Sequence, residues 1–180
     1  STQKQLERHL QFLESAVAYI RENRTLNRFL KGAAEDSGTV KRQLEQGANL
    51  FSEGNLAAEA CPVIRDFYIC SDQMRLEENH FYPLSMSQKK VLRREILKLL
   101  EDFQEGEEEF AYRTREGVLE LCFRLYDERM EPMGYCAVTL DQAGLGSIFT
   151  PLEKYEAYDW GLLDRSGKQI CGTQLPFQNI

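Results

Sequence analysis

The chain has 180 residues, with 29 acidic against 22 basic side chains and a formal net charge of -7 at pH 7. This balance disfavours nucleic acid and anionic lipid as partners, because both are bound through clusters of Lys and Arg. A hydrophobic fraction of 42% and a charged fraction of 28% are ordinary for a globular protein, and they predict one domain over residues 1–180.

Residues 3–31 carry the pattern of a long amphipathic helix. Apolar side chains recur at spacings of three and four residues, at Leu6, Leu10, Leu13, Val17, Ile20 and on to Leu30. At ~1.5 Å per residue the helix would be roughly 40 Å long, more than a small domain covers. One end would then pair with a second copy in a homodimer or lead into a membrane anchor; the alternative is a helix packed along one sheet. The chain starts inside this pattern without an initiator Met, which suggests a piece of a longer protein.

A second helix, a strand and a long connection follow. The apolar spacing predicts a helix over 39–51 and a strand over 63–70. The strand is apolar on both faces apart from Arg65 and Asp66, which indicates a central place in a sheet. Residues 71–86 indicate an irregular connection, either a binding segment or lid or a surface loop with its two aromatic residues in the core.

The middle of the chain predicts a helix and three strands. The helix covers 87–103 and runs into an acidic stretch over 101–109, which is typical of a solvated face. The strands cover 110–114, 118–126 and 133–141, and the last two form a hairpin.

Side chains alternate along the strand over 118–126, so that its two faces differ. One face is apolar and is predicted to pack against the long helix, through Leu119, Leu121, Phe123 and Leu125. The other face is more polar, with Glu120, Cys122, Arg124 and Tyr126.

The C-terminal part predicts a short helix over 142–149 and two paired strands over 157–164 and 168–172. The order of elements indicates an α+β fold with a mainly antiparallel sheet of about five to six strands. We expect the helix over 1–31 to lie across the back of a module formed by 39–180.

The sequence carries no phosphate-binding loop, dinucleotide fingerprint, nucleophile elbow or zinc-protease motif. We therefore expect neither enzymatic activity nor a cofactor. The five cysteines are scattered and odd in number, which favours buried free thiols. The alternatives are a disulfide between Cys122 and Cys136 on neighbouring strands, or a metal site, for which the ligand spacing is absent.

The polar face of the hairpin is the candidate binding surface. The candidate ligand-binding residues are Arg124, Tyr126, Tyr135, Thr139, Trp160 and Tyr112. Aromatic rings with an Arg and a hydroxyl on a sheet face suit a small-molecule ligand, and the Arg could pair with a carboxylate. The alternative is a solvated face on which Arg124 and Glu120 form a surface pair.

Three segments resemble a known family. The string FRLYDERMEPMGYCAVTLDQAGLGSIF at 123–149 resembles the end of an extracellular Cache sensor domain of bacterial membrane receptors. The string YDWGLLDRSGKQICG at 158–172 looks like the strand, turn and strand that follow there. The opening HLQFLESAVAYIRENRTLNRFLKG at 9–32 is similar to the long first helix of such domains in sensor histidine kinases.

The resemblance implies a PAS-like antiparallel sheet, a long N-terminal helix across its back and a small-molecule ligand on its front. It also implies an extracytoplasmic location in a membrane-anchored receptor, a two-component sensor histidine kinase or a chemoreceptor, that signals by helix displacement. The chain departs from the family in two respects. Thr139 stands where amino-acid-binding members have an Asp, and the chain is short for a domain with two modules.

Two other functions stay open at this point. A cytoplasmic PAS- or GAF-like regulatory module would suit five cysteines in a reducing compartment. A dimerisation module without a ligand would place the function in the long helix.

Overall fold

The computed structural model describes residues 17–53, 64–115, 117–141, 161–163 and 169–172. The helices are α2 (Arg24–Leu30), α3 (Ser37–Glu53) and α4 (Met86–Glu105). The strands are β1 (Ile64–Cys70), β2 (Leu76–His80), β3 (Phe110–Arg115), β4 (Val118–Tyr126), β5 (Pro132–Asp141), β6 (Gly161–Leu163) and β7 (Gln169–Gly172). Over the described residues, none of the helices has the length and apolar character needed to cross a membrane.

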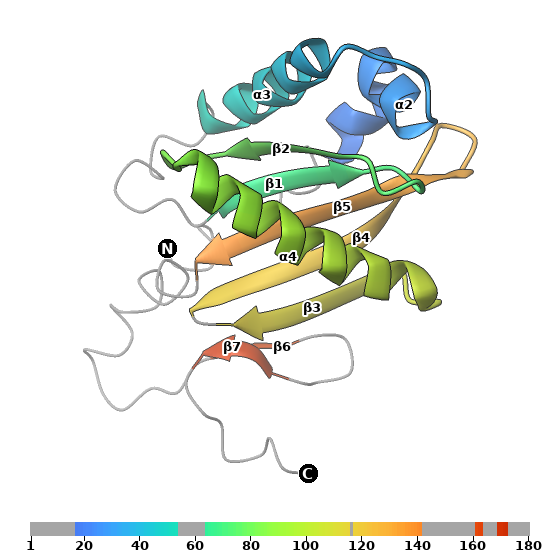
Figure 1. Ribbon diagram of the computed structural model, residues 1–180. Coiled ribbons are helices and arrows are strands. Elements are labelled where there is room, and N and C mark those ends of the chain that lie inside the picture. Colours follow the sequence, from blue (N-terminus) through green and yellow to red (C-terminus); the bar gives the residue numbers. More distant parts are fainter. Residues whose placement is uncertain (1–16, 54–63, 116, 142–160, 164–168, 173–180) are drawn as a thin grey trace.

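The fold is α+β, as predicted, and is built on a five-stranded antiparallel sheet in the order β2-β1-β5-β4-β3. Figure 1 shows α2 and α3 on one side of this sheet and α4 running diagonally across the other. Strands β6 and β7 form a separate antiparallel pair beside β3, which confirms the predicted C-terminal pairing. The helix predicted over 142–149 and most of the strand predicted over 157–164 lie outside the described residues.

The long helix predicted over 3–31 is interrupted at Asn23, so the prediction of one continuous helix is wrong. Residues 17–22 are helical, Asn23 has an extended backbone with φ -86° and ψ 114°, and α2 begins at the next residue. The side-chain oxygen of Asn23 accepts a hydrogen bond from the Leu26 N–H at 3.0 Å, as the N-cap of α2.

A second asparagine holds this break in place. The Asn27 side-chain amide donates to the backbone carbonyls of Ile20, Arg21 and Asn23 at 2.7–2.9 Å. The Asn23 amide in turn donates to the Gln43 side chain of α3 at 2.9 Å. The apolar spacing continues through the break, and therefore could not reveal it.

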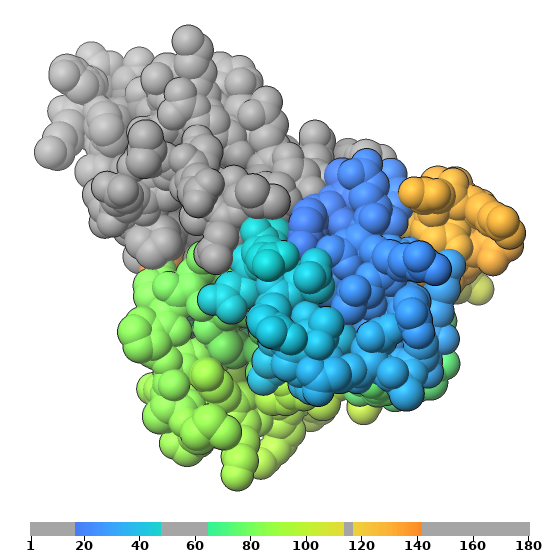
Figure 2. Space-filling model, turned by 90° about the horizontal axis from the view of Figure 1, so that it is seen from above, coloured from blue at the N-terminus to red at the C-terminus, as the bar shows by residue number. Residues whose placement is uncertain are grey.

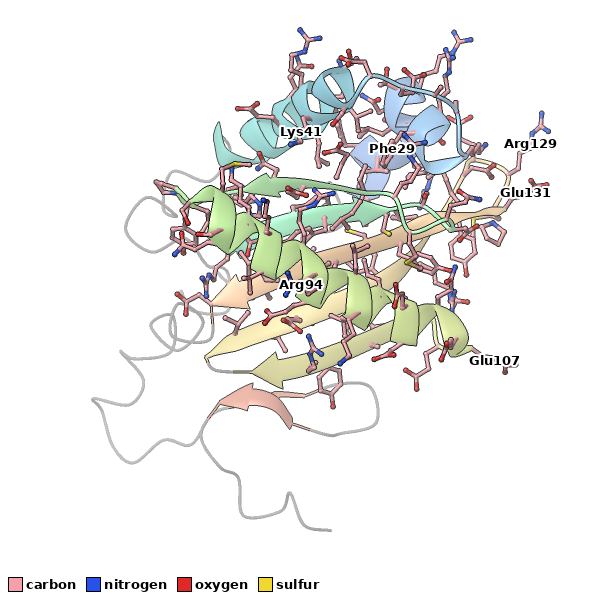
Figure 3. All side chains as sticks on the ribbon, in the orientation of Figure 1. Phe29, Lys41, Arg94, Glu107, Arg129 and Glu131 are labelled. Atoms are coloured by element: carbon pink, nitrogen blue, oxygen red, sulfur yellow. The ribbon has the colours of Figure 1, made fainter. Side chains whose placement is uncertain are left out.

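The first core lies between the back of the sheet and the helices α2 and α3. Its buried members include Leu26, Leu30, Val40, Leu119, Leu121, Leu125 and Val138. Phe29, labelled in Figure 3, packs between α2 and the sheet, and Figure 2 shows α2 and α3 side by side over this face. The predicted apolar face of β4 and the predicted helix over 39–51 are thereby confirmed.

Residues 71–86 are not an irregular connection throughout, because they contain the edge strand β2. Strand β2 pairs with β1 from Cys70 opposite Leu76 to Asp66 opposite His80. Its sequence, LEENH, buries Glu and His side chains through polar contacts and lacks the apolar alternation that identifies a strand. The predicted burial of Phe81 is confirmed in part, since it is half-buried against the first core.

The hairpin of β4 and β5 is confirmed, and its connecting turn is tied to α2. The Asp127 carboxylate accepts hydrogen bonds from the backbone N–H groups of Arg129 and Glu131. It also forms an ion pair with Lys31, with a distance of 2.9 Å between Lys31 Nζ and Asp127 Oδ2. The hydrogen bond from Lys31, with the backbone donors, lowers the pKa of Asp127. Arg129 and Glu131 extend from the tip of the turn into solvent (Figure 3), and Figure 2 shows this turn beside α2.

Cys70, Cys122 and Cys136 of the five-stranded sheet are buried free thiols. The alternative of a disulfide between Cys122 and Cys136 is wrong. Cys122 is opposite Ala137 and Cys136 is opposite Phe123, so the two side chains point to opposite faces of the sheet.

The replacement Gly134→Ala is expected to destabilise the protein by about 2 kcal/mol or more. Gly134 has φ +151°, and a Cβ there would lie 2.4 Å from the backbone oxygen of Cys70 and 3.1 Å from Leu30. Urea unfolding followed by circular dichroism measures the loss. Gly106→Ala is the matched control, since its Cβ would meet only ordinary contacts; equal stability of the two variants would contradict the expectation.

Candidate functional site

Helix α4 covers much of the front of the sheet. Ser85 caps it in a capping box with Gln88, which fixes where the helix begins. Its buried side chains Ile96, Leu100 and Phe103 form a second core with residues on the front of the sheet, among them Tyr68, Cys70, Leu76, Cys122, Tyr135 and Ala137. The predicted helix over 87–103 is therefore confirmed, and the middle of the front face is packed rather than solvated.

Arg124, predicted to bind a ligand, holds the C-terminal end of α4. Its guanidinium donates to the carbonyls of Phe103 (3.3 Å), Gly106 (2.6 Å) and Glu108 (2.9 Å). It also lies 5.0 Å from the ring centre of Phe103 and 5.5 Å from that of Tyr135. Carbonyls at a helix C-terminus lack helical partners, and a cation there stabilises the helix end.

Two other predicted residues lie near the same end of α4. The Tyr126 hydroxyl donates to the Glu109 carboxylate, and Tyr126 is otherwise largely outside the core. Tyr135 is buried, with its ring edge-on to Phe103 at 5.9 Å. Burial raises the pKa of the Tyr135 hydroxyl, and a hydrogen bond with Gln104 opposes that effect.

A polar row crosses the sheet at the other end of the front face. It takes one side chain from each of the five strands, in the order His80, Asp66, Thr139, Glu120 and Arg113, and each residue is paired with the next across the strands. The backbone register shifts beside Asp66, between Ile64 and Asp66, at a β-bulge. Asp66, Thr139 and Glu120 are each only 3% exposed. A row of charged groups at this depth requires partners for every charge.

The side chains of the polar row bond to one another along its length. The Asp66 carboxylate contacts His80 Nδ1 at 2.5 Å and accepts the Thr139 hydroxyl proton at 2.7 Å. The Glu120 carboxylate accepts from Arg113 Nε at 2.6 Å. The row therefore divides into an Asp66 half and a Glu120 half, and each half contains its own cation.

A second ion pair ties α4 to the edge strand beside this row. The Arg93 guanidinium of α4 bonds to the Glu78 carboxylate and donates to the Leu76 carbonyl at 3.1 Å. Glu78 Oε1 is 3.9 Å from His80 Nε2. Arg93 near one end and Arg124 at the other thus fasten α4 to the sheet.

Over the residues that the structure describes, three buried polar atoms of the front face have no hydrogen-bond partner, the Tyr68 hydroxyl, His80 Nε2 and Arg113 Nη2. The last two still lie in ion pairs, with Glu78 and Glu120 respectively. The rings of Tyr68 and His80 meet edge-on at 5.8 Å. Burial, followed by the nearby carboxylates of Asp66 and Glu78, raises the pKa of Tyr68 far above its ordinary value, so the hydroxyl stays protonated. A buried hydroxyl and a buried imidazole of this kind can bond to a further small molecule.

The predicted ligand residues therefore do not form one cluster. Thr139 belongs to the polar row, whereas Tyr135 is four residues away on the same strand, about 13 Å along it. Arg124 and Tyr126 lie at the Tyr135 end. Tyr112 is on the opposite face, half-buried against the first core. Trp160 lies outside the described residues.

Asp66, His80 and Arg113 were not among the predicted residues. Asp66 left a signal in the sequence, because it interrupts a strand that is otherwise apolar. His80 left none, since the strand that carries it was not recognised. In the described residues, no group of three or more His, Cys, Asp or Glu side chains is arranged to hold a metal ion.

No family model matches the chain, and no curated protein matches it in sequence. Solved structures do match its fold. The ligand-binding domain of the Pseudomonas aeruginosa amino acid chemoreceptor PctC, in complex with GABA, is 15% identical with a TM-score of 0.52, over 94% of this chain and 67% of that one. The sensory domain of the Campylobacter jejuni chemoreceptor Tlp3, with isoleucine bound, is 11% identical with a TM-score of 0.53, over 99% of this chain and 69% of that one.

The chain therefore has the fold of chemoreceptor sensor domains. This finding confirms, at the level of the fold, the resemblance to extracellular sensor domains that the sequence indicated.

Replacing Arg124 by Met is expected to lower the stability of the protein by about 1–3 kcal/mol, because three backbone carbonyls lose a charged donor. Arg124→Lys should recover part of the loss, since an ammonium group cannot match the planar guanidinium against all three. Urea unfolding measures both. Arg129→Met, at the exposed tip of the hairpin, is the control; a loss no larger at Arg124 would show that the cap contributes nothing.

Proposed function

We propose that the chain is an extracytoplasmic sensor domain of a bacterial membrane receptor and that it binds a small molecule on the front of its sheet. The fold shared with chemoreceptor sensor domains supports this proposal. So do the hairpin and first-helix patterns of the sequence. The domain itself carries no catalytic role in this proposal, and residues 1–180 form a single sensing module.

The observation that carries the proposal is the front face at the polar row. An apolar surface under α4 adjoins buried charged groups, and among the described residues the Tyr68 hydroxyl and His80 Nε2 have no hydrogen-bond partner there. Ligand sites typically combine apolar walls with a few fixed polar groups in this way. Burying such groups without a partner is unfavourable, so a bound molecule that supplies hydrogen bonds would stabilise the folded domain.

Small amino compounds are the first ligands to test. The PctC domain was solved with GABA and the Tlp3 domain with isoleucine. In this chain Thr139 stands where the resemblance places an Asp, but its hydroxyl is 2.7 Å from the Asp66 carboxylate of the neighbouring strand. Because a carboxylate can accept further hydrogen bonds, Asp66 would supply an acceptor for an ammonium group from β1 instead of β5.

The parent receptor would be membrane-anchored and would signal by displacement of its N-terminal helix, with dimerisation through that helix. The sequence pattern of the first helix favours a two-component sensor histidine kinase, whereas the structural neighbours are chemoreceptors and favour that class of output. The parent gene separates the two by the domain that follows. Apolar segments of ~20 residues on either side would support the receptor, and their absence would contradict it.

A cytoplasmic regulatory module is the second candidate. Cys70, Cys122 and Cys136 are free and buried, and burial raises the pKa of each of these thiols. Such thiols are stable in a reducing compartment, but they are also unreactive, and so they do not exclude an oxidising one.

We expect a bound ligand to raise the melting temperature of the domain by about 5–10 °C at a concentration of 100 Kd. A thermal-shift panel of GABA, branched amino acids, short amines and short carboxylates measures this. Thr139→Val removes one hydroxyl of the polar row at constant volume and should reduce the shift at least several-fold.

Tyr112→Phe is the matched control, because it removes a hydroxyl from the opposite face and should leave the shift unchanged. Equal losses in the two variants would place the ligand elsewhere. A flat response of the intact domain to the whole panel, together with titration calorimetry that detects no heat, would reject ligand binding of this class.

A further inference from the structure

A buried imidazole–carboxylate pair joins the edge strand to the rest of the sheet. His80 is the last residue of β2, and its Nδ1 is 2.5 Å from the Asp66 carboxylate of β1. The two side chains are only 7% and 5% exposed. Five residues later Ser85 caps α4, so the pair is located where the chain leaves the sheet to form its front cover.

Charged and titratable groups surround this imidazole on several elements. They are Asp66 and Tyr68 of β1, Glu78 of β2, Arg93 of α4, Lys41 of α3 and, further along the polar row, Glu120 of β4. Glu120 is neutralised by Arg113. Asp66 and Glu78 therefore form ion pairs with one imidazole and one guanidinium, that of Arg93, while the exposed Lys41 acts on Glu78 from a longer distance.

The charge balance of this group depends on the imidazole. With His80 protonated, two buried carboxylates face two cations. With His80 neutral, Arg93 is the one cation of the described residues left in an ion pair with the two carboxylates, and the bare Nε2 lone pair faces Glu78 Oε1 at 3.9 Å. Buried charges are tolerated only when they are paired, so the neutral form weakens the contacts of β2 and α4 in this region.

We propose that a proton on His80 fastens the end of β2 and the start of α4 to the sheet, and that this corner of the domain loosens when the proton is lost at alkaline pH. The proposal concerns the domain without ligand and goes beyond the proposed sensing of a small molecule. It makes the front cover itself responsive to pH.

The direction of the effect follows from the pKa of His80. Burial alone would lower this pKa, but the carboxylates of Asp66 and Glu78 outweigh it and raise the pKa to about 9 from the ordinary 6.5. A group whose pKa is raised on folding stabilises the fold fully below its unfolded value and loses that contribution as the pH rises through its folded value. The affected window is therefore between pH 6.5 and about 9.

At acid pH, a different group, Glu78, controls the stability of this region. Although burial opposes ionisation, His80 and Arg93 lower the pKa of Glu78 below its ordinary 4.5. The contribution of Glu78 is present above pH 4.5 and is lost as the pH falls through its lowered pKa. Loss of the proton from His80 is thus the event that mildly alkaline conditions bring about.

The two histidines of the chain make a direct test feasible, because His9 and His80 are the only imidazole signals. We would titrate the 180-residue protein from pH 5.5 to 10 by NMR of its imidazole carbons, in the wild type and in His9→Gln, which identifies the His80 signal. The expected result is a pKa well above 8 for His80. Asp66→Asn should return it towards 6.5 or below.

The four methionine methyl groups report whether the cover loosens. Met86 begins α4 near His80, whereas Met74 and Met130 lie in the connections at the far ends of their hairpins and Met133 lies in the first core. We expect the chemical shift of the Met86 methyl group to change as His80 titrates, and the chemical shifts of the other three methionine methyl groups to stay constant. The melting temperature should fall by about 5 °C between pH 6.5 and 9 in the wild type and in His9→Gln, and by clearly less in His80→Gln.

Three results would each overturn the proposal. They are a His80 pKa at or below 6.5, a Met86 methyl chemical shift that does not change as His80 titrates, and a melting temperature with the same pH dependence in His80→Gln as in the wild type. The wild-type titration needs no variant, so a His80→Gln protein that fails to fold leaves the test intact. None of these measurements uses a ligand, and the ligand panel can fail or succeed independently.

Discussion

The burial of β5 on both faces is the constraint on which the rest of the structure depends. Every residue from Met133 to Leu140 of this central strand is buried. A strand of this kind is stable only if both faces of the sheet are covered. Helices α2 and α3 cover the back and α4 covers the front, each with its own hydrophobic core. The charged side chains of the front face are gathered at one end, in the polar row, where neighbouring strands supply their counter-charges.

Elements whose stability comes from apolar burial were predictable from the sequence, and elements held by polar contacts were not. The alternation of β4 identified both of its faces, and the spacing of apolar residues located α3 and α4 to within a few residues. Strand β2 was missed because its Glu and His side chains are buried through ion pairs. The break at Asn23 was missed because side-chain amides produce it while the apolar spacing continues.

The candidate site shows the same division between features that apolar alternation predicts and features that polar contacts determine. Alternation placed Arg124 on the correct face, but the face alone did not reveal that the end of α4 lies against it and accepts its donors. Asp66 was visible as the acidic interruption of an apolar strand. Its partners His80 and Thr139 are 14 and 73 positions away in the sequence, and only the pairing of the strands brings the three together. Registers between strands are long-range information that composition and periodicity do not contain.

The interruption at Asn23 has a mechanical consequence. A continuous helix would transmit a push or a twist along its own axis into α2. Here residues 17–22 form a separate segment, and the hydroxyl of Tyr19 and the amide of Asn23 attach it sideways to Gln43 of α3 at 2.7 and 2.9 Å. Helix α3 lies against β2, where Ser37 bonds to Glu77 at 2.5 Å. The joint therefore links residues 17–22 to α3 and through α3 to the edge strand β2, in addition to the route through α2 to the β4–β5 turn.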